Sequence, residues 1–548
     1  MFLRNRELIT EDKKEKGHSE VILLYGLGLF FIYKILFKIF DKILAYANDP
    51  RKFSIMVLIC LMLSAIGVIK LRKKITTLKK KNEDLRAISE KADDAVYCGV
   101  DDENKEVWIK PKQRGMHTQV IGTTNAGKTE SVILPWAIQD IQQGRGLILI
   151  DGKADGSLLE KLWAYTVKAG REKDFRLFSL GNIDKSYQFN PLIGGTAEEI
   201  TERVFNSFEF ENQHYRSIQF EVMVQAMRIF EKNGITPTFK RLHQAISKTN
   251  VLISLAIKSK DQDLIDWAAD FQKLEPKEKE QRTVGLLSAI GHFSHGHTSI
   301  LFNADKSALT IDEALEKNLI VYFQLPVLLS PFLGKATGKL ILQSLQSAVA
   351  NRHRGSNNKK FFSVFLDDFS EYLYPGFVSI LNKSRSANVG IVFAHQALGD
   401  IQTLGDPVAN SILTNSNLKV FMRGNDPDSA EYFSKVIGTN TSTKFTERQK
   451  KGTFQTEKTG DLSAREVEEF TIHPNEFKRN LGVGEAIVLI PHNQGTKAVK
   501  LKFQMFDDLA VLPIGKIEKT GALNLSEEDF KDKSKPESKS VMDLTNKG

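Results

Sequence analysis

The chain has 548 residues, of which 41% are hydrophobic and 26% charged, so it can form large cores and is neither collagen-like nor wholly disordered. Two cysteines, Cys60 and Cys98, are too few for a disulfide scaffold or a cysteine-rich zinc domain. The net charge of +9 belongs to the N-terminus, since residues 1–81 hold 17 Lys and Arg against 7 Asp and Glu, and the rest hold 59 against 60. Because this basic excess lies beside apolar segments, we interpret it as a membrane-topology signal and not as a sign of nucleic-acid binding.

Two apolar segments follow an N-terminal stretch of 20 residues that we expect in the cytoplasm. Residues 53–69 carry no charge and run directly into a basic cluster at 70–74, the pattern of a membrane span with a cytoplasmic stop. Residues 21–40 are a weaker span, because Lys34 and Lys38 interrupt them. The link is too short for an external domain. The sequence therefore predicts a transmembrane hairpin over 21–70, with a buried core hairpin as the alternative.

A nucleotide-binding loop follows a helical stalk (71–94) and two short β-type runs. Residues 116–121 read as a strand, G-x-x-x-x-G-K-T follows, and residues 130–143 read as a helix, which is the Walker A pattern in its required context. Glycines let backbone N–H groups face the phosphates, and the lysine neutralises the β- and γ-phosphates. ATP and Mg²⁺ are thus the predicted cofactors, with Thr129 as a metal ligand. The predicted phosphate-binding residues are Gly122, Thr123, Thr124, Asn125, Ala126, Gly127, Lys128 and Thr129.

Paired carboxylates end a later apolar run, F-F-S-V-F-L-D-D, at Asp367 and Asp368. This is the expected form of a Walker B strand, in which the first acid holds Mg²⁺ and the second polarises the attacking water. The second position holds Asp rather than the longer Glu, so its role as base is the less secure of the two. An earlier β-type run, residues 146–151, ends at Asp151, which faces either the nucleotide or solvent.

Two further candidates lie around the strand predicted at 390–394. Arg385 precedes it and is a candidate to stabilise γ-phosphate charge from a neighbouring subunit. Gln396 follows it and is a candidate γ-phosphate sensor, placed with Lys128, Asp368 and Arg385 among the catalytic residues. Arg423 is a second candidate arginine finger. A surface arginine and a capping glutamine are the alternatives.

These motifs in this order resemble the type IV secretion coupling proteins of the TraD/TraG kind. The resemblance rests on the two N-terminal spans, G-T-T-N-A-G-K-T-E, L-I-L-I-D-G-K, F-L-D-D-F-S-E and the run from Leu381 to Gln396, and it covers about residues 20–500. It implies an α/β fold: a RecA-like P-loop ATPase with a mostly parallel central sheet, anchored by two transmembrane helices and interrupted by an all-α domain. By the same resemblance, the all-α domain helps to recognise substrates.

The resemblance further implies a homo-hexameric, inner-membrane ATPase whose bulk lies in the cytoplasm. Such a protein recruits a relaxase bound to single-stranded DNA, or a protein effector, and drives transfer through the type IV secretion channel by ATP hydrolysis. The expected partners are single-stranded DNA, the relaxase or relaxosome, channel proteins and membrane lipid. Two other functions remain open at this point: a DNA translocase of the FtsK/HerA type, and a receptor that binds ATP but scarcely hydrolyses it.

The predicted division of the chain follows from these segments. The C-terminal stretch is rich in Lys, Glu, Ser and Asp and is expected to be disordered. The predicted parts are the N-terminus (1–20), the transmembrane hairpin (21–70), the stalk (71–94), the first part of the nucleotide-binding domain (95–195), the all-α insertion (196–310), the second part of the nucleotide-binding domain (311–513) and the tail (514–548).

Overall fold

The computed structural model describes residues 92–526 apart from seven short gaps, together with a few isolated residues between 62 and 72. The chain divides into two compact units, residues 1–87 and 88–548. The predicted spans at 21–40 and 53–69 lie almost entirely outside the described residues, as does most of the predicted stalk. Within the described part of the chain, no helix has the length and apolar character needed to cross a membrane. The gaps are 211–212, 307–308, 355–358, 452–455, 493–494, 511–512 and 522–523.

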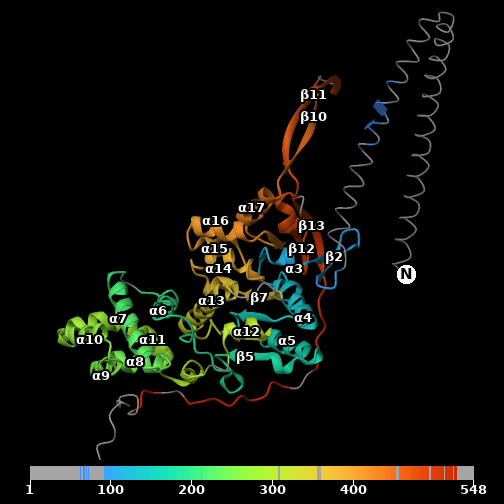
Figure 1. Ribbon diagram of the computed structural model, residues 1–548. Coiled ribbons are helices and arrows are strands. Elements are labelled where there is room, and N and C mark those ends of the chain that lie inside the picture. Colours follow the sequence, from blue (N-terminus) through green and yellow to red (C-terminus); the bar gives the residue numbers. More distant parts are fainter. Residues whose placement is uncertain are drawn as a thin grey trace, which may run out of the picture. The chain divides into compact units, whose positions relative to one another are not determined.

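An eleven-stranded sheet forms the centre of the second unit (Figure 1). Seven neighbouring strands run parallel, and four further strands extend one edge in antiparallel orientation. In spatial order the parallel strands are β9 (Leu418–Met422), β3 (Thr118–Ile121), β8 (Val389–His395), β7 (Phe362–Asp367), β4 (Leu147–Asp151), β6 (Ile320–Gln324) and β5 (Phe175–Ser179). The antiparallel strands, continuing outward from β9, are β12 (Glu485–His492), β13 (Gly495–Phe503), β1 (Val96–Asp101) and β2 (Glu106–Ile109).

Helices cover both faces of the sheet, and the strand sequences show why. In β4 the side chains of Ile148 and Ile150 pack in one core, and those of Leu147 and Leu149 pack in another. Successive side chains of a strand point to opposite faces, so a strand buried on both faces reads as a continuous apolar run. One face carries α4 (Leu134–Gln142) and α5 (Gly156–Lys168). The other carries α12 (Ile311–Lys317), α13 (Pro331–Arg354), α14 (Phe377–Ser384), α15 (Leu398–Gln402), α16 (Asp406–Asn415) and α17 (Pro427–Ile437).

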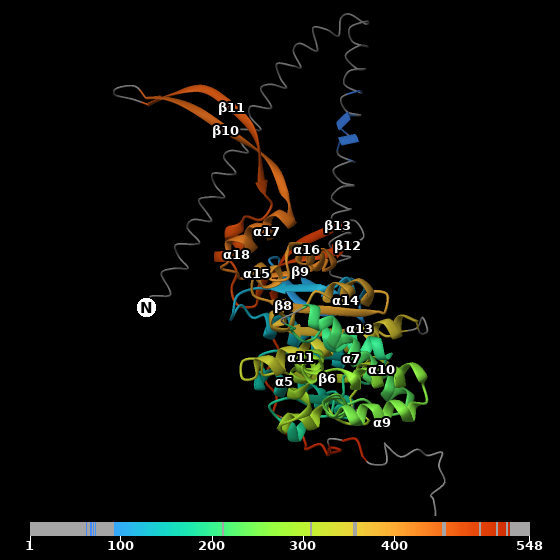
Figure 2. The same cartoon turned by 90° about the vertical axis from the view of Figure 1, so that its left-hand side faces the viewer.

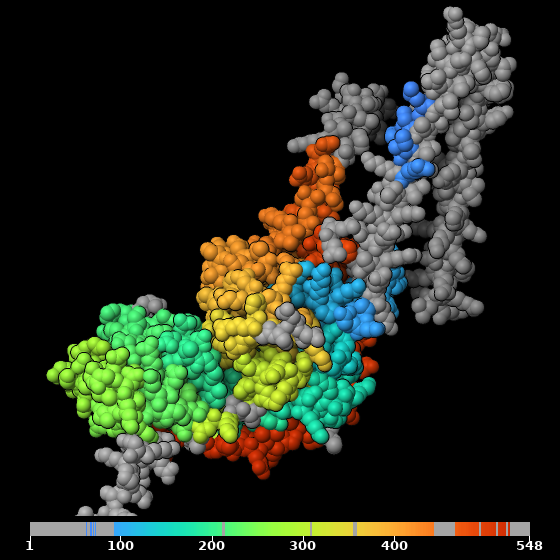
Figure 3. Space-filling view, in the orientation of Figure 1, coloured from blue at the N-terminus to red at the C-terminus, as the bar shows by residue number. Residues whose placement is uncertain are grey.

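A group of helices leaves the sheet between β5 and β6 and forms a lobe at one side (Figures 1 and 3). It begins with a capping box, in which the Thr196 hydroxyl accepts from the Glu199 backbone N–H and the Glu199 carboxylate accepts from that of Thr196. Met223 and Phe230 are buried inside the lobe. Its helices are α6 (Ala197–Phe205), α7 (Gln213–Lys232), α8 (Phe239–Ser247), α9 (Thr249–Ser259), α10 (Gln262–Lys273) and α11 (Pro276–Ser294).

A long hairpin projects from the sheet unit near α17 and α18 (Pro474–Arg479), as Figure 2 shows. Its two antiparallel strands are β10 (Thr439–Lys451) and β11 (Thr456–Phe470). A short helix, α3 (Pro111–Arg114), precedes β3 and brings Arg114 into the core, where its guanidinium makes a bidentate ion pair with Asp140 at 2.7 Å. This buried bidentate pair joins α3 to α4 in a fixed geometry.

The chain beyond 512 corrects one prediction. The described residues between 513 and 526, here called the C-terminal strap, run along the outside of the unit (Figure 3). The backbone N–H of Ile517 donates to the Asp184 carbonyl at 2.8 Å, and that of Thr520 donates to Gln188 Oε1 at 3.0 Å. Leu525 is buried against the helical lobe. The expected disorder from residue 514 is therefore wrong for the described residues of the strap, because backbone hydrogen bonds and the buried Leu525 hold them in place.

Candidate functional site

The loop between β3 and the helical turn Lys128–Ile133 has the curvature that phosphate binding requires. Gly127 has φ +97°, in the left-handed region that favours glycine. A Cβ at Gly127 would lie 2.9 Å from the Ser131 hydroxyl, so neighbouring atoms also exclude a side chain. The loop is tied to the sheet, because the Thr123 N–H donates to the Arg423 carbonyl at 2.9 Å. The loop is thus a fixed cradle of backbone N–H groups at the start of a helix.

The Lys128 side chain folds back over this loop. Its Nζ donates to the carbonyls of Gly122 at 2.8 Å and Thr123 at 3.2 Å. Burial lowers the pKa of Lys128, and the nearby Asp367 carboxylate opposes that shift. A buried ammonium held inside the phosphate cradle is placed to neutralise an anion there.

Thr129 and Asp367 meet across two different strands. The Thr129 hydroxyl donates to Asp367 Oδ2 at 2.7 Å, joining the helical turn after β3 to the end of β7. Burial and the neighbouring Asp368 raise the pKa of Asp367. A hydroxyl and a carboxylate at this spacing supply the hard oxygen ligands that Mg²⁺ prefers, with phosphates and water completing its shell. The two residues predicted as metal ligands therefore fit that metal.

Asp368 lies beside this pair in an unusual backbone conformation. Its φ of +47° is left-handed, which aspartate tolerates better than most residues. Its Oδ2 lies 2.8 Å from Lys153 Nζ, and its side chain is nearly buried. Gly152 packs beside it, since a Cβ there would lie in ordinary van der Waals contact with Asp368 Cβ at 3.5 Å. Lys153 thus brings a cation to the candidate base, a role that the sequence did not indicate.

Asp151 completes a cluster of three carboxylates, because it stands opposite Asp367 in the β4–β7 register. It is fully buried and accepts from the backbone N–H groups of Lys153 at 2.9 Å and Asp155 at 2.7 Å, and from the Tyr322 hydroxyl at 2.8 Å. Burial raises the pKa of Asp151 to about 6, with a further contribution from Asp367. Since its oxygens already accept these bonds, Asp151 shapes the turn that carries Lys153 instead of facing solvent.

Gln396 lies at the phosphate loop. The Thr124 hydroxyl lies 3.4 Å from Gln396 Oε1, and the Gln396 backbone N–H donates to Asp400 Oδ2 at 2.7 Å. Arg423, directly after β9, contacts the loop through its carbonyl oxygen. Residues that follow the carboxyl ends of β3, β7, β8 and β9 therefore gather at one edge of the sheet, where ligands of parallel α/β sheets bind.

Arg385 does not join this group. It follows α14 and precedes β8, so it lies at the amino-terminal edge of the parallel strands, opposite the phosphate loop. There it faces His117, whose pKa falls to about 4 through burial first and the charge of Arg385 as a minor contribution. Its side chain is exposed at this edge of the sheet.

A buried polar chain beneath the loop was missed from the sequence. Lys419 Nζ on β9 donates to Gln119 Oε1 on β3 at 3.0 Å, and Gln119 Nε2 lies 3.0 Å from His395 Nε2 on β8. Burial lowers the pKa of Lys419 to about 7 and that of His395 to about 4. The signal was a lysine and a glutamine inside otherwise apolar strands. This series of hydrogen-bonded side chains ends at His395, next to Gln396, and so connects the candidate sensor to β9.

Comparison with known proteins identifies relatives of this chain. A family described as "TraM recognition site of TraD and TraG" matches residues 362–480. The type 4 coupling protein DotL of Legionella pneumophila is 23% identical over 415 residues, which is 64% of this chain and 52% of DotL. The chain therefore spans about half the length of this curated relative.

Solved structures share the fold. The bacterial conjugative coupling protein TrwBdeltaN70 superposes with a TM-score of 0.57 at 17% identity, covering 78% of this chain and 92% of that one. TrwB in complex with the ATP analogue ADPNP gives a TM-score of 0.58 at 15% identity, with 78% and 93% covered. The predicted α/β fold with a large, mostly parallel central sheet is confirmed. Together with the motif order and the two sequence matches, this fold identifies the chain as a relative of the type IV secretion coupling proteins.

Proposed function

We propose that this chain is the coupling ATPase of a type IV secretion system, recruiting a substrate at the membrane and driving its transfer by ATP hydrolysis. The observation that carries the proposal is the bond from Thr129 to Asp367, which brings a Walker A loop and an acidic strand end together at one edge of the sheet. The relationship to coupling proteins supports the secretion role. TrwB has been crystallised with ADP and Mg²⁺, which supports the same cofactors here.

In this proposal each residue has a distinct task. Backbone N–H groups of residues 122–127 and the Lys128 ammonium bind the phosphates, and Thr129 and Asp367 hold Mg²⁺, which supplies charge neutralisation on the phosphates. Asp368 accepts a proton from the attacking water. Gln396 contacts the γ-phosphate side of the loop.

The assembly and its partners belong to the same proposal. Arg385 lies on the edge away from its own loop, so it reaches a phosphate only across a subunit boundary, which favours a ring such as a homo-hexamer. We propose inner-membrane anchoring through residues 21–70, with the bulk of the chain in the cytoplasm. The proposed partners are a relaxase with single-stranded DNA or a protein effector, the secretion channel and membrane lipid.

Hydrolysis by the full-length chain tests this function. ATP turnover is measured with and without single-stranded DNA, beside Lys128→Ala, which loses the phosphate-binding ammonium, and Arg385→Ala. We expect DNA-stimulated turnover that disappears in both variants. Adding Lys128→Ala protein to Arg385→Ala protein should restore part of the activity, because mixed rings then contain complete sites. Turnover in Lys128→Ala equal to that of the unchanged chain would refute the proposed site.

One observation favours a second candidate, a receptor that binds ATP but hydrolyses it slowly. The Asp368 carboxylate is one methylene shorter than the Glu of the usual acid pair, so it extends less far toward an attacking water. Asp368→Glu adds one methylene to the candidate base. If ATP binds tightly to the unchanged chain without turnover, and the Glu variant hydrolyses it, the receptor is the better description. Equal, rapid turnover by both proteins would exclude it.

A further inference from the structure

The buried polar chain of Gln119, His395 and Lys419 crosses the middle of the parallel sheet beneath the phosphate loop. These residues lie on β3, β8 and β9 and are 0%, 1% and 6% exposed. Parallel strands covered by helices on both faces are normally apolar, and a buried polar group costs free energy unless it is hydrogen-bonded. Packing alone does not explain these three residues, and their hydrogen bonds indicate another role.

The hydrogen bonds of the buried polar chain run in one direction. Lys419 Nζ donates to Gln119 Oε1 at 3.0 Å, so the Gln119 amide turns its Nε2 toward His395. At the other end the Ala397 carbonyl can only accept, so His395 Nδ1 carries a proton and donates to it at 2.8 Å. Burial lowers the pKa of His395 to about 4, so the ring is neutral and its Nε2 accepts from Gln119 Nε2 at 3.0 Å. Both ends therefore fix the same tautomer of His395.

The last of these bonds encloses Gln396. It joins the side chain of His395 to the carbonyl of Ala397, the residues directly before and after Gln396. In addition, Asp400 Oδ2 accepts from the backbone N–H groups of Gln396 at 2.7 Å and Ala397 at 3.1 Å. The backbone around Gln396 is thus held by two side chains. The side chain of Gln396 is exposed, with its Oε1 3.4 Å from the Thr124 hydroxyl of the phosphate loop.

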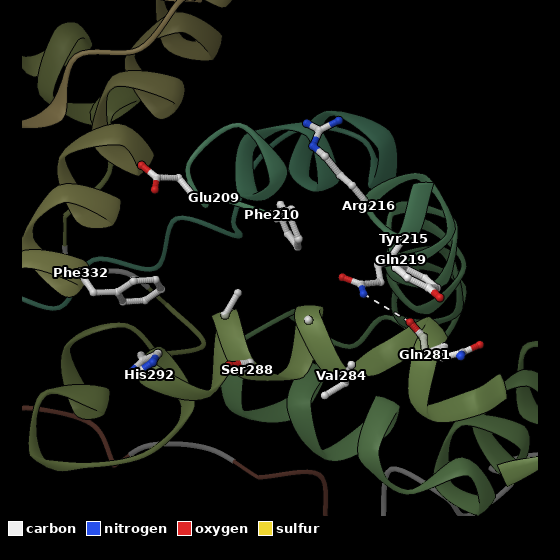
Figure 4. Close-up of a pocket in the computed structure, with 12 residues that line it drawn as sticks. Glu209, Phe210, Tyr215, Arg216, Gln219, Gln281, Val284, Ser288, His292 and Phe332 are labelled. Carbon is white, nitrogen blue, oxygen red and sulfur yellow. Dashed lines mark hydrogen bonds between the residues drawn. The ribbon is translucent and has the colours of Figure 1, made fainter. Parts of the chain in front are cut away.

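A buried glutamine in the helical lobe shows that complete bonding is not automatic. Gln219 lines a groove between α7 and α11, where its Nε2 makes one long bond to the Gln281 carbonyl at 3.4 Å (Figure 4). Gln219 is 4% exposed, and its Oε1 has no hydrogen-bond partner among the described residues. By contrast, both amide atoms of Gln119, both ring nitrogens of His395 and Lys419 Nζ are hydrogen-bonded. A buried network bonded in this way holds its members in one geometry.

We propose that Gln119 and His395 are positioning residues for Gln396, holding its side-chain amide, through the Ala397 carbonyl, where it meets the γ-phosphate of bound ATP. Both act through Gln396, because both are buried beneath the phosphate loop. Lys419 orients Gln119 from the far end of the buried polar chain. The inference rests on the proposed function and deepens it, because it names the residues that fix the contact with the γ-phosphate.

The first experiment separates the γ-phosphate contact from the rest of nucleotide binding in the full-length chain. The kcat for ATP hydrolysis depends on the γ-phosphate, whereas ADP has no group for Gln396 to meet. We expect Gln119→Leu and Gln396→Ala each to lower kcat at least tenfold. The affinity for ADP, measured by displacement of a fluorescent ADP analogue, should stay within twofold of the unchanged chain. A parallel loss of ADP affinity in Gln119→Leu would mean that Gln119 only supports the phosphate loop, and would overturn the proposal.

A double substitution tests whether Gln119 acts through Gln396. In the Gln396→Ala background the side chain to be positioned is absent, so adding Gln119→Leu should change kcat by less than a further twofold. A further tenfold loss in the double variant would overturn the proposal, because the two residues would then act independently.

His395 offers a matched pair of variants. The amide of His395→Asn keeps an N–H group at about the place of Nδ1 and can still donate to the Ala397 carbonyl, so kcat should stay within threefold of the unchanged chain. His395→Leu is similar in size, lacks any donor and should lower kcat at least tenfold. Equal losses in the two variants would overturn the role of this bond.

Two controls separate these effects from general damage. Gln219→Leu removes the buried glutamine of the helical lobe and should leave both kcat and ADP affinity within twofold of the unchanged chain. Trp136 is buried in the core on one face of the same sheet, so its fluorescence during urea unfolding reports whether each variant is folded.

The outcomes distinguish this inference from the proposed function. If ATP turnover is normal in the unchanged chain and equally fast in Gln119→Leu, the inference fails and the proposed ATPase stands. If no condition gives turnover by the unchanged chain, the proposed ATPase fails, and the ratio of affinities for ADPNP and ADP decides the inference. A fall of at least tenfold in that ratio in Gln119→Leu supports the positioning role, and an unchanged ratio overturns it.

Discussion

Lys419 offers a quantitative test of the buried polar chain beneath the phosphate loop. Burial lowers its pKa from 10.5 to about 7, whereas the unfolded chain exposes it to water. Between these two values the unfolded state binds a proton that the folded state does not, so stability rises with pH. The resulting destabilisation is about 4 kcal/mol at pH 7 and about 2 kcal/mol at pH 9. A change of about 2 kcal/mol across an accessible pH range follows.

Lys419→Met removes the titrating group and keeps a side chain of similar length. The variant also loses the bond to the Leu413 carbonyl at 2.7 Å and leaves Gln119 Oε1 without that donor. Its stability at any one pH therefore reflects both the lost hydrogen bonds and the removal of the titrating amine. The change in stability between pH 7 and pH 9 reflects the titrating amine alone. We expect the free energy of unfolding of Lys419→Met, relative to the unchanged chain, to fall by about 2 kcal/mol from pH 7 to pH 9.

Urea unfolding of the full-length chain at pH 7, 8 and 9 measures this difference. Trp136, buried on the adjoining face of the sheet, reports the transition by its fluorescence. Lys435→Met, at an exposed position on α17, controls for the loss of one positive charge and should show no such trend. The free energies of unfolding of Lys419→Met and of the unchanged chain are compared at each pH. If their difference stays constant over this range, the lowered pKa of Lys419 is refuted.

Two further substitutions test the packing and the site. Gly146→Ala should lower the free energy of unfolding by about 1–3 kcal/mol in the same urea assay, because its Cβ would lie 2.5 Å from Asn318 Cα. Gly156→Ala is the control: its Cβ would meet nothing within 4 Å, so its stability should match that of the unchanged chain. Lys153→Ala leaves Asp368 without its cation and should lower kcat/KM for ATP by about tenfold, equivalent to about 1.4 kcal/mol, while Lys153→Arg keeps most of the activity. Equal kinetics of the two Lys153 variants would show that the charge is unimportant.

Local motifs placed the phosphate loop and the acidic strand end, because both depend on short runs whose geometry is set by neighbouring residues. Gly127 needs its left-handed φ for the loop to turn, and an apolar run ending in Asp367 needs only a parallel sheet. The order of the strands was not available from such runs. The strand order places β3 between β9 and β8, and this brings Lys419, Gln119 and His395 into one hydrogen-bonded series.

Two other features depend on contacts between distant segments. The pairing of Lys153 with Asp368 depends on the left-handed backbone at Asp368 and on the turn after β4 that Asp151 holds, neither of which a single residue type specifies. The course of the C-terminal strap escaped prediction because its apolar residues, such as Ile517 and Leu525, are few and have no helix or strand periodicity. Its binding depends on Gln188 and Gln244, which lie more than 280 residues earlier in the chain.

The strap changes the mechanics of the molecule. The helical lobe is inserted between β5 and β6, and its two covalent links lie side by side, because the Phe189 N–H donates to the Leu301 carbonyl at 2.8 Å. The strap is bonded to Asp184 and Gln188 in the first of these links and to Gln244 on α8, and the contact with α8 is a third attachment of the lobe. A body held at two adjacent points can swivel, whereas three separated points resist torsion. In the proposed ATPase, such an attachment would make the lobe follow movements of the sheet instead of rotating independently of it.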